Sequence, residues 1–194
     1  MHSLYIDSSL GLVIGLLDSD YSWVEYLSLD EKKPSEIIHF EIYKILQKHN
    51  LKLSDIRCFV SSGPGSYTGM RLSEGVAQMF ELASMPVYSF CHFEVPILCG
   101  FENGFWATNA FKGQVFIYNW KGENIEKQLV KKEDFFIEDE AFGFTLDSND
   151  PLFCKLISTK NLIQEKSSEI FSKIAAIKLR ESPFYFRTLD EEFN

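Results

Sequence analysis

A glycine-rich loop between a strand and a helix constrains the fold of this chain more than any other feature of its sequence. Residues 61–71 read Ser-Ser-Gly-Pro-Gly-Ser-Tyr-Thr-Gly-Met-Arg. Residues 57–60 before the loop are strand-like, and residues 72–80 after it are compatible with a helix. Gly63, Gly65 and Gly69 let the backbone approach a ligand or another chain closely. The pattern predicts a strand, a tight loop and a helix N-terminus in succession.

The start of a helix attracts anions, because its first amide groups lack carbonyl partners and lie at the positive end of the helix dipole. Ser66 or Thr68 would cap this helix, and Arg71 would place a cation over the same mouth. The loop is not a P-loop, because Met70 rather than lysine follows Gly69, and the Rossmann spacing fails too. Two interpretations stay open: a loop that meets a ligand or partner, and a tight structural turn.

Composition excludes several classes of protein. A chain of 194 residues with 45% hydrophobic residues can bury a core, as one domain or two small lobes. It has no apolar run of about eighteen residues and no signal-peptide pattern, so we expect a cytoplasmic protein without a membrane span. The cysteines have no Cys-x-x-Cys spacing, which argues against zinc and against a disulfide framework. They are Cys58, Cys91, Cys99 and Cys154.

The net charge of −9 opposes strong binding of nucleic acid, because such binding needs clustered lysine and arginine to displace counterions. The pairs Lys32-Lys33 and Lys131-Lys132 are each flanked by acidic residues. We expect both pairs to be solvated surface.

The predicted elements follow one order along the chain. Three strands come first, then a helix, a fourth strand, the glycine loop with its helix, and a fifth strand. These lie at residues 3–7, 11–17, 23–29, 34–49, 56–61, 66–84 and 86–90. Beyond them, residues 105–110 and 114–120 predict a hairpin. Residues 161–181 predict a single helix that Pro183 stops.

The segment Gly63 to Arg71 resembles the GPGS(F/Y)TG(L/V/M)R signature of the TsaB (YeaZ) family, bacterial proteins that act in the synthesis of threonylcarbamoyladenosine in tRNA. Residues 4–9, Leu-Tyr-Ile-Asp-Ser-Ser, resemble the family's opening strand, and residues 183–187 resemble its closing Pro-x-Tyr-Leu-Arg. The second half departs from the family. Asn109-Ala110-Phe111 stands where relatives carry Asp-Ala-Arg, and Pro34-Ser35 keeps only the serine of an expected His-Ser pair.

The resemblance implies an α/β, two-lobed actin-like (ASKHA, ribonuclease H-like) fold. Its first lobe, residues 1–103, would hold a mixed sheet and two helices, and residues 104–194 would form a smaller, divergent second lobe. It also implies a non-catalytic scaffold subunit that binds and supports a TsaD-like catalytic subunit and works with a TsaE-like ATPase. The product would be threonylcarbamoyladenosine at position 37 of tRNAs that read codons starting with A. We expect no strong direct tRNA binding, no cofactor bound by this chain alone, and any nucleotide at the partner interface.

Asp7 is the candidate remnant of a phosphate or metal site, because an acid at the end of the first strand helps hold magnesium and phosphates in active actin-like ATPases. No second acid beside a nucleotide-clasping loop accompanies it, and no histidine lies in a catalytic motif. The sequence therefore predicts no catalytic residue and no metal site.

The first two helices carry apolar residues on more than one face, whereas a surface helix of a small domain needs only one apolar stripe. This excess predicts a helical protein–protein interface; the alternative is that the sheet and the neighbouring helix bury both faces. The predicted interface residues are Ile38, Ile42, Ile45, Met70 and Leu82, with the loop residues Gly63, Gly65, Ser66, Thr68, Gly69 and Arg71.

Two other classes of function stay open. One is an enzyme, either a small actin-like ATP-binding protein or a metallopeptidase-like protein. The other is a self-associating module that forms a homodimer. Nucleotide binding by the isolated chain would favour the first, and a stable homodimer that ignores TsaD would favour the second.

Overall fold

The computed structural model describes residues 1–29, 33–137 and 142–186. Its contacts divide the chain into two compact units. Of the described residues, unit 1 comprises those within 1–92 and 167–185, and unit 2 comprises those within 93–166 together with Phe186. This division differs from the predicted boundary after residue 103, because the chain returns to unit 1 near its end. A single cut in the sequence therefore cannot separate the two units.

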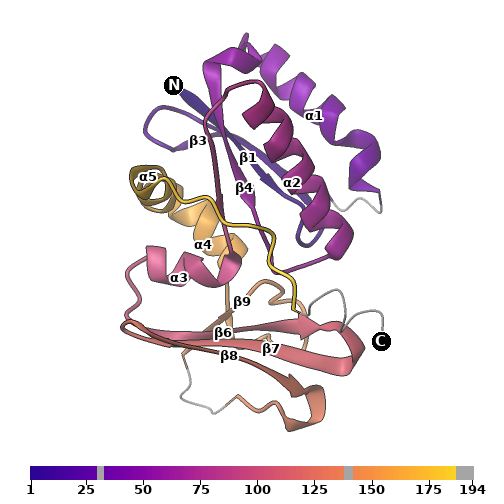
Figure 1. Ribbon diagram of the computed structural model, residues 1–194, viewed down its shortest axis with the longest axis vertical. Helices are drawn as coiled ribbons and strands as arrows, with labels where there is room; N and C mark the ends of the chain where they lie inside the picture. Colours follow the sequence, from indigo (N-terminus) through magenta and orange to yellow (C-terminus); the bar gives the residue numbers. More distant parts are fainter. Residues whose placement is uncertain (30–32, 138–141, 187–194) are drawn as a thin grey trace. The chain divides into compact units, whose positions relative to one another are not determined.

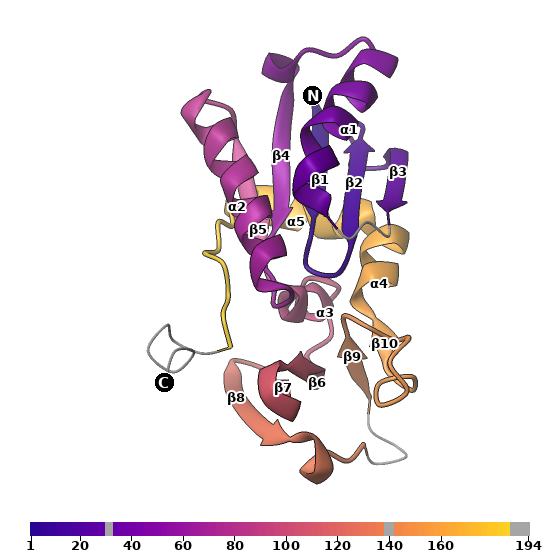
Figure 2. The ribbon, with the colours of Figure 1, turned by 90° about the vertical axis from the view of Figure 1, so that its right-hand side faces the viewer.

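Unit 1 is built on a mixed five-stranded sheet, sheet 1 (Figure 1). The strand order is β3-β2-β1-β4-β5, and Figure 2 labels all five strands. The strands are β1 (His2–Asp7), β2 (Leu12–Leu17), β3 (Trp23–Leu29), β4 (Ile56–Ser61) and β5 (Val87–Phe90). The first three pair antiparallel, whereas β4 pairs parallel with β1 and β5 parallel with β4. This is the predicted order of a ribonuclease H-like half of an actin-like fold, and the five predicted strands are confirmed.

Two helices cover one face of sheet 1: α1 (Pro34–Lys48) and α2 (Tyr67–Leu82) (Figure 2). Side chains alternate along a strand, so Leu4 and Ile6 of β1 share a face and belong to the same buried cluster as Ile45 of α1 and Val76 of α2. Each fully buried side chain of this kind contributes about 1.5–3 kcal/mol. This cluster fixes both helices on the sheet.

The opposite face of sheet 1 is covered by α5 (Ser167–Ile177). Phe171 of α5 is fully buried, and its ring centroid lies 5.3 Å from that of Tyr5, 4.9 Å from that of Phe59 and 6.1 Å from that of Phe90. These aromatic contacts explain why residues near the end of the chain belong to unit 1.

The prediction of one helix over residues 161–181 is wrong. The structure has α4 (Thr159–Glu165) in unit 2 and α5 in unit 1. Lys166 leaves the helical conformation with φ −117° and ψ 31°, so the helix breaks where the chain passes from one unit to the other. Lys178 adopts φ +53°, which ends α5 before Pro183 can do so.

Unit 2 contains a second mixed sheet, sheet 2, in the order β10-β9-β6-β7-β8. Its strands are β6 (Asn103–Ala110), β7 (Gln114–Lys121), β8 (Asn124–Lys131), β9 (Gly143–Thr145) and β10 (Ile157–Ser158). The predicted hairpin is confirmed as β6–β7. Ala107, Val115 and Phe153 are fully buried in the core of this unit.

Short helices complete the two units: α3 (Val95–Leu98) and the 3-10 helices η1 (Leu53–Asp55), η2 (His92–Glu94), η3 (Phe111–Gly113) and η4 (Lys132–Asp134). Among the residues that the structure describes, no helix is long and apolar enough to cross a membrane.

Candidate functional site

The glycine loop joins β4 to α2 and is bonded to the turn that follows β1. Ser66 is the N-cap of α2, and its hydroxyl accepts a hydrogen bond from the Gly69 amide at 3.3 Å. The Ser66 amide donates to the Ser9 carbonyl at 2.8 Å, and the Ser8 hydroxyl donates to the Gly69 carbonyl at 2.6 Å. Of the two predicted capping residues, Ser66 is confirmed, and the loop has partners within its own unit.

The three glycines of the loop are explained by close packing inside unit 1. A Cβ atom at Gly69 would lie 1.8 Å from the Ser8 carbonyl oxygen, and one at Gly65 would lie 2.5 Å from the Ser9 carbonyl oxygen. Gly63 has φ +94°, which L-residues rarely adopt, and its Cβ would meet the Met70 sulfur at 2.2 Å. The close approach that these glycines permit is therefore an approach to the protein's own chain.

The Asp7 carboxylate at the end of β1 is buried, with 1% of the residue exposed. Its Oδ1 accepts the Ser9 amide at 2.8 Å, and its Oδ2 accepts the Tyr5 hydroxyl at 3.3 Å. His92 Nε2 lies 3.1 Å from Oδ2, and His92 is also fully buried. Burial, followed by the nearby Asp7 charge, raises the pKa of Tyr5 well above its ordinary value, so the phenol remains a donor.

The pairing of Asp7 with His92 was missed by sequence reasoning. Asp7 ends β1 and His92 follows β5, and both strands run parallel to β4 between them. The carboxyl ends of parallel strands meet at one edge of a sheet, so the topology brings the two residues together. That shared edge is the signal that would have indicated the pair.

The surroundings of Asp7 do not fit a magnesium or phosphate site. Its carboxylate is enclosed and faces donors from its own chain, whereas a magnesium site keeps several waters and open carboxylate oxygens. Across the described ranges, no three His, Cys, Asp or Glu side chains gather as ligands for a metal ion.

Four of the predicted interface residues face the core, so their placement on a partner surface is wrong. Ile38 and Ile45 of α1 are 0% and 1% exposed, Ile42 is 7% exposed, and Met70 of α2 is 2% exposed. The physical reason is that Ile38, Ile42 and Ile45 belong to the apolar cluster between the helices and sheet 1, and Met70 packs against Gly63 of the loop. Leu82 differs, because it is 89% exposed.

Both helices nevertheless present large apolar side chains to solvent, at positions three residues apart. On α1 these are Phe40 and Tyr43, which are 60% and 58% exposed. On α2 they are Met79 and Leu82, which are 57% and 89% exposed. We call these four residues the helix-pair surface; it lies on the helices drawn in front of sheet 1 in Figure 2.

Arg71 lies on the exposed side of the start of α2. Its guanidinium carbon is 4.4 Å from the centroid of the Tyr67 ring, and Tyr67 in turn packs against Tyr185 at 5.2 Å. Ser66 and Thr68 beside it are exposed. As far as the described residues show, Arg71 stacks on an aromatic ring without an ion pair.

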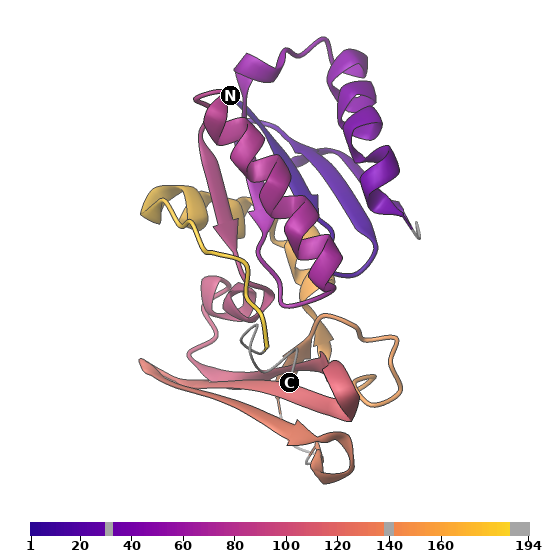
Figure 3. The same cartoon turned by 45° about the vertical axis from the view of Figure 1, so that its right-hand side comes forward.

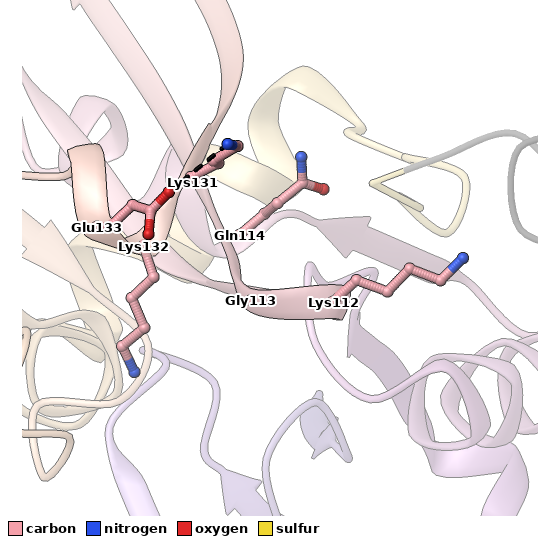
Figure 4. A pocket seen from close by; sticks show the side chains of 6 residues that line it. All are labelled: Lys112, Gly113, Gln114, Lys131, Lys132 and Glu133. Atoms are coloured by element: carbon pink, nitrogen blue, oxygen red, sulfur yellow. Dashed lines mark ion pairs between the residues drawn. The ribbon is translucent and has the colours of Figure 1, made fainter.

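Unit 2 has an open hollow of about 510 Å³ at the end of the β7–β8 pair, lined by Lys112, Gly113, Gln114, Lys131, Lys132 and Glu133. The Lys112 and Lys132 side chains extend in different directions (Figure 4). Lys131 pairs with Glu133 at 3.6 Å, and Lys132 pairs with Asp150 at 3.9 Å. Because the side chains of Lys112 and Lys132 do not converge, and Lys131 and Lys132 are paired with acids, this hollow does not form an anion site.

Comparison with known proteins gives a match at the level of structure. No protein-family model and no curated protein matches the sequence. The solved structure of YeaZ from Pseudomonas aeruginosa matches with a TM-score of 0.65 and 17% identity, over 95% of this chain and 99% of that one. The chain has the YeaZ fold. A second structure, an uncharacterized protein from the same organism with similarity to peptidase YeaZ, gives 0.67 and 16% over 96% and 99%.

The YeaZ match confirms the fold class that the resemblance of the glycine loop implied. It extends over the second half of the chain, where the sequence departs from the family's motifs. At this level of identity the comparison shows the fold alone.

Proposed function

We propose that this protein is a non-catalytic scaffold subunit that binds a TsaD-type subunit through α1 and α2. The complex would form threonylcarbamoyladenosine at position 37 of tRNAs that read codons starting with A, with a TsaE-type ATPase as a further partner. The helix-pair surface is the observation that carries this proposal. The match to the YeaZ structure supports the proposal, because the scaffold role is the one expected for the TsaB (YeaZ) family.

The helix-pair surface has the character of a protein interface. A single exposed apolar residue is ordinary, but here each of the two helices that cover one face of sheet 1 exposes two large apolar side chains three positions apart. Aromatic residues and methionine are enriched at the centres of interfaces. Burying a large apolar side chain completely contributes up to about 1.5–3 kcal/mol, so a partner that covered these four residues would gain from their burial.

The geometry at the end of β1 supports a role without catalysis. Asp7 is enclosed by Tyr5, Ser9 and His92, so magnesium or phosphate would have to displace bonds that the fold itself makes. In this proposal the chain binds no nucleotide by itself, and any nucleotide of the complex lies where the two subunits meet.

The test replaces Leu82 or Phe40 by glutamate and measures the affinity for the TsaD subunit by calorimetry. Burying an unpaired carboxylate costs several kcal/mol, so each variant should bind about a hundredfold more weakly or worse. Ile177→Glu is the matched control, because Ile177 is 62% exposed on α5, on the opposite face of sheet 1. Native affinity in both Leu82→Glu and Phe40→Glu would exclude this surface as the contact.

The two alternatives have their own readouts. A homodimer that persists with excess TsaD would favour self-association, and light scattering of the mixture measures it. ATP hydrolysis by the purified chain, abolished by substituting Asp7, would favour an enzyme.

A further inference from the structure

The segment after α5, residues 179–185, lies along the outer edge of sheet 1 beside α2 (Figure 3). We call it the strap. The Ser89 amide of β5 donates to the Leu179 carbonyl at 3.0 Å, and the Glu181 amide donates to the Ser89 carbonyl at 3.2 Å. Further along, the Phe184 amide donates to the Ser62 carbonyl at 2.8 Å. The strap is therefore bonded from the edge of β5 to the start of the glycine loop.

Arg180 of the strap uses its whole guanidinium group to join α2 to β5. Nη2 and Nη1 donate to the two carboxylate oxygens of Glu74 at 2.9 and 3.1 Å, which is a fork on one acid. Nε donates to Glu81 at 2.7 Å, and Nη1 also donates to the Ser89 hydroxyl at 3.0 Å. Bonding to Glu74 and Glu81 raises the pKa of Arg180, and the group stays charged.

The two glutamates lie at the ends of a stretch of α2 that contains a glycine. They are seven residues apart, so Arg180 holds two points on one side of the helix about 10.5 Å apart along its axis. Gly75 lies between them with no neighbouring atom within 4 Å of a Cβ position, and glycine inside a helix loosens it. Met79 lies within the same stretch and Leu82 directly after it. The orientation of both apolar side chains depends on how this stretch is held.

We propose that Arg180 is a positioning residue for partner binding, which holds the C-terminal half of α2 so that Met79 and Leu82 meet the partner in one orientation. This inference rests on the proposed function. Arg180 acts through Glu74, Glu81 and Ser89 and need not touch the partner itself. Lysine cannot replace it, because an ammonium group lacks the planar fork that bonds both acids at once.

The experiment measures the affinity for the TsaD subunit, and the hydrogen exchange of residues 72–82, at a temperature where every variant is folded. Arg180→Met and Arg180→Lys should each bind about tenfold more weakly and exchange faster in α2. Glu81→Gln keeps the fork on Glu74 and should show a smaller change of the same sign. Lys173→Met is the control, because it removes a cation paired with Glu169 on α5.

Arg180 also neutralises two carboxylates, and a triple variant separates this effect from positioning. Arg180→Met combined with Glu74→Gln and Glu81→Gln removes the unpaired charges but leaves the helix unclamped, so binding should stay weak. Native affinity in this triple variant, or in Arg180→Lys, would overturn the inference. Should Arg180→Met fail to fold, Glu81→Gln with native affinity and exchange would overturn it as well.

The exchange measurement separates this inference from the proposed function. If the wild-type chain does not bind TsaD, the proposed function fails, and unchanged exchange of α2 in Arg180→Lys would still reject the clamp. If the wild-type chain binds and the Arg180 variants bind equally well, the proposed function stands and the inference alone is wrong.

Discussion

Replacing Gly69 by alanine tests whether the glycine loop is a packing device. The added methyl carbon would lie 1.8 Å from the Ser8 carbonyl oxygen and 2.8 Å from the Ser8 carbonyl carbon. Real contacts of this kind are about 3.2 Å or longer, so the two backbones would have to separate by more than about 1 Å. The hydrogen bond from the Ser8 hydroxyl to the Gly69 carbonyl holds them together. Overpacking at a site that cannot yield costs about 3 kcal/mol or more.

Gly75→Ala provides the control, because it makes the same chemical change in the same helix. No atom lies within 4 Å of its Cβ position, so alanine should stabilise α2 by about 0.5–1 kcal/mol. Urea unfolding and thermal unfolding, both followed by circular dichroism, measure the stability of both variants. The melting temperature should fall for Gly69→Ala and rise for Gly75→Ala, by roughly 2–4 °C for each kcal/mol. A Gly69→Ala protein as stable as the wild type would refute the packing account of the loop.

Three further predictions concern stability and reactivity. Asp7→Ala should cost about 3 kcal/mol of unfolding free energy, because buried donors including the Tyr5 hydroxyl lose their acceptor; unchanged urea unfolding would contradict this. Hydrogen bonds with Lys48 and, as a smaller effect, with His49 lower the pKa of Glu25. The stability that the ionised Glu25 contributes is therefore present above about pH 4.5 and is lost as the pH falls through the lowered pKa. Glu25→Gln should therefore destabilise the protein at neutral pH and converge with the wild type in acid; a constant difference across that range would be the opposite result. Burial raises the pKa of the Cys58 thiol, so an aromatic disulfide reagent at about pH 8 should modify exposed Cys154 and leave Cys58 unmodified until the protein unfolds.

The sequence was most informative where local pattern and tertiary structure agree. The strands of sheet 1 have β-rich apolar segments bounded by turn residues, and Pro34 occupies the first turn of α1, where its missing amide costs nothing. The glycine loop was predicted in its place between strand and helix, and the packing of its glycines agrees with the interpretation as a tight structural turn. The atoms that require Gly65 and Gly69 belong to Ser8 and Ser9, more than fifty residues away in the sequence.

Long-range packing explains the remaining errors. The regular apolar spacing of residues 161–181 predicts one continuous helix. The helix breaks at Lys166 because α4 and α5 bury their apolar faces in different units, which the spacing does not indicate. The strand β8 was not predicted, since most of its side chains are exposed and it carries no alternating apolar pattern. The apolar excess of α1 and α2 was recognised, but the sequence alone did not separate core residues such as Ile38 from exposed ones such as Phe40.

The most direct test of the scaffold account is hydrogen exchange of the wild-type protein, free and bound to the TsaD subunit. The account predicts that binding protects the amides around Phe40 and Tyr43 of α1 and around Met79 and Leu82 of α2, because their solvent-facing sides become an interface. Sheet 2 and α5 should exchange as they do in the free protein. Protection confined to β6, β7 and β8, or no protection at a TsaD concentration that saturates a measured complex, would contradict the account.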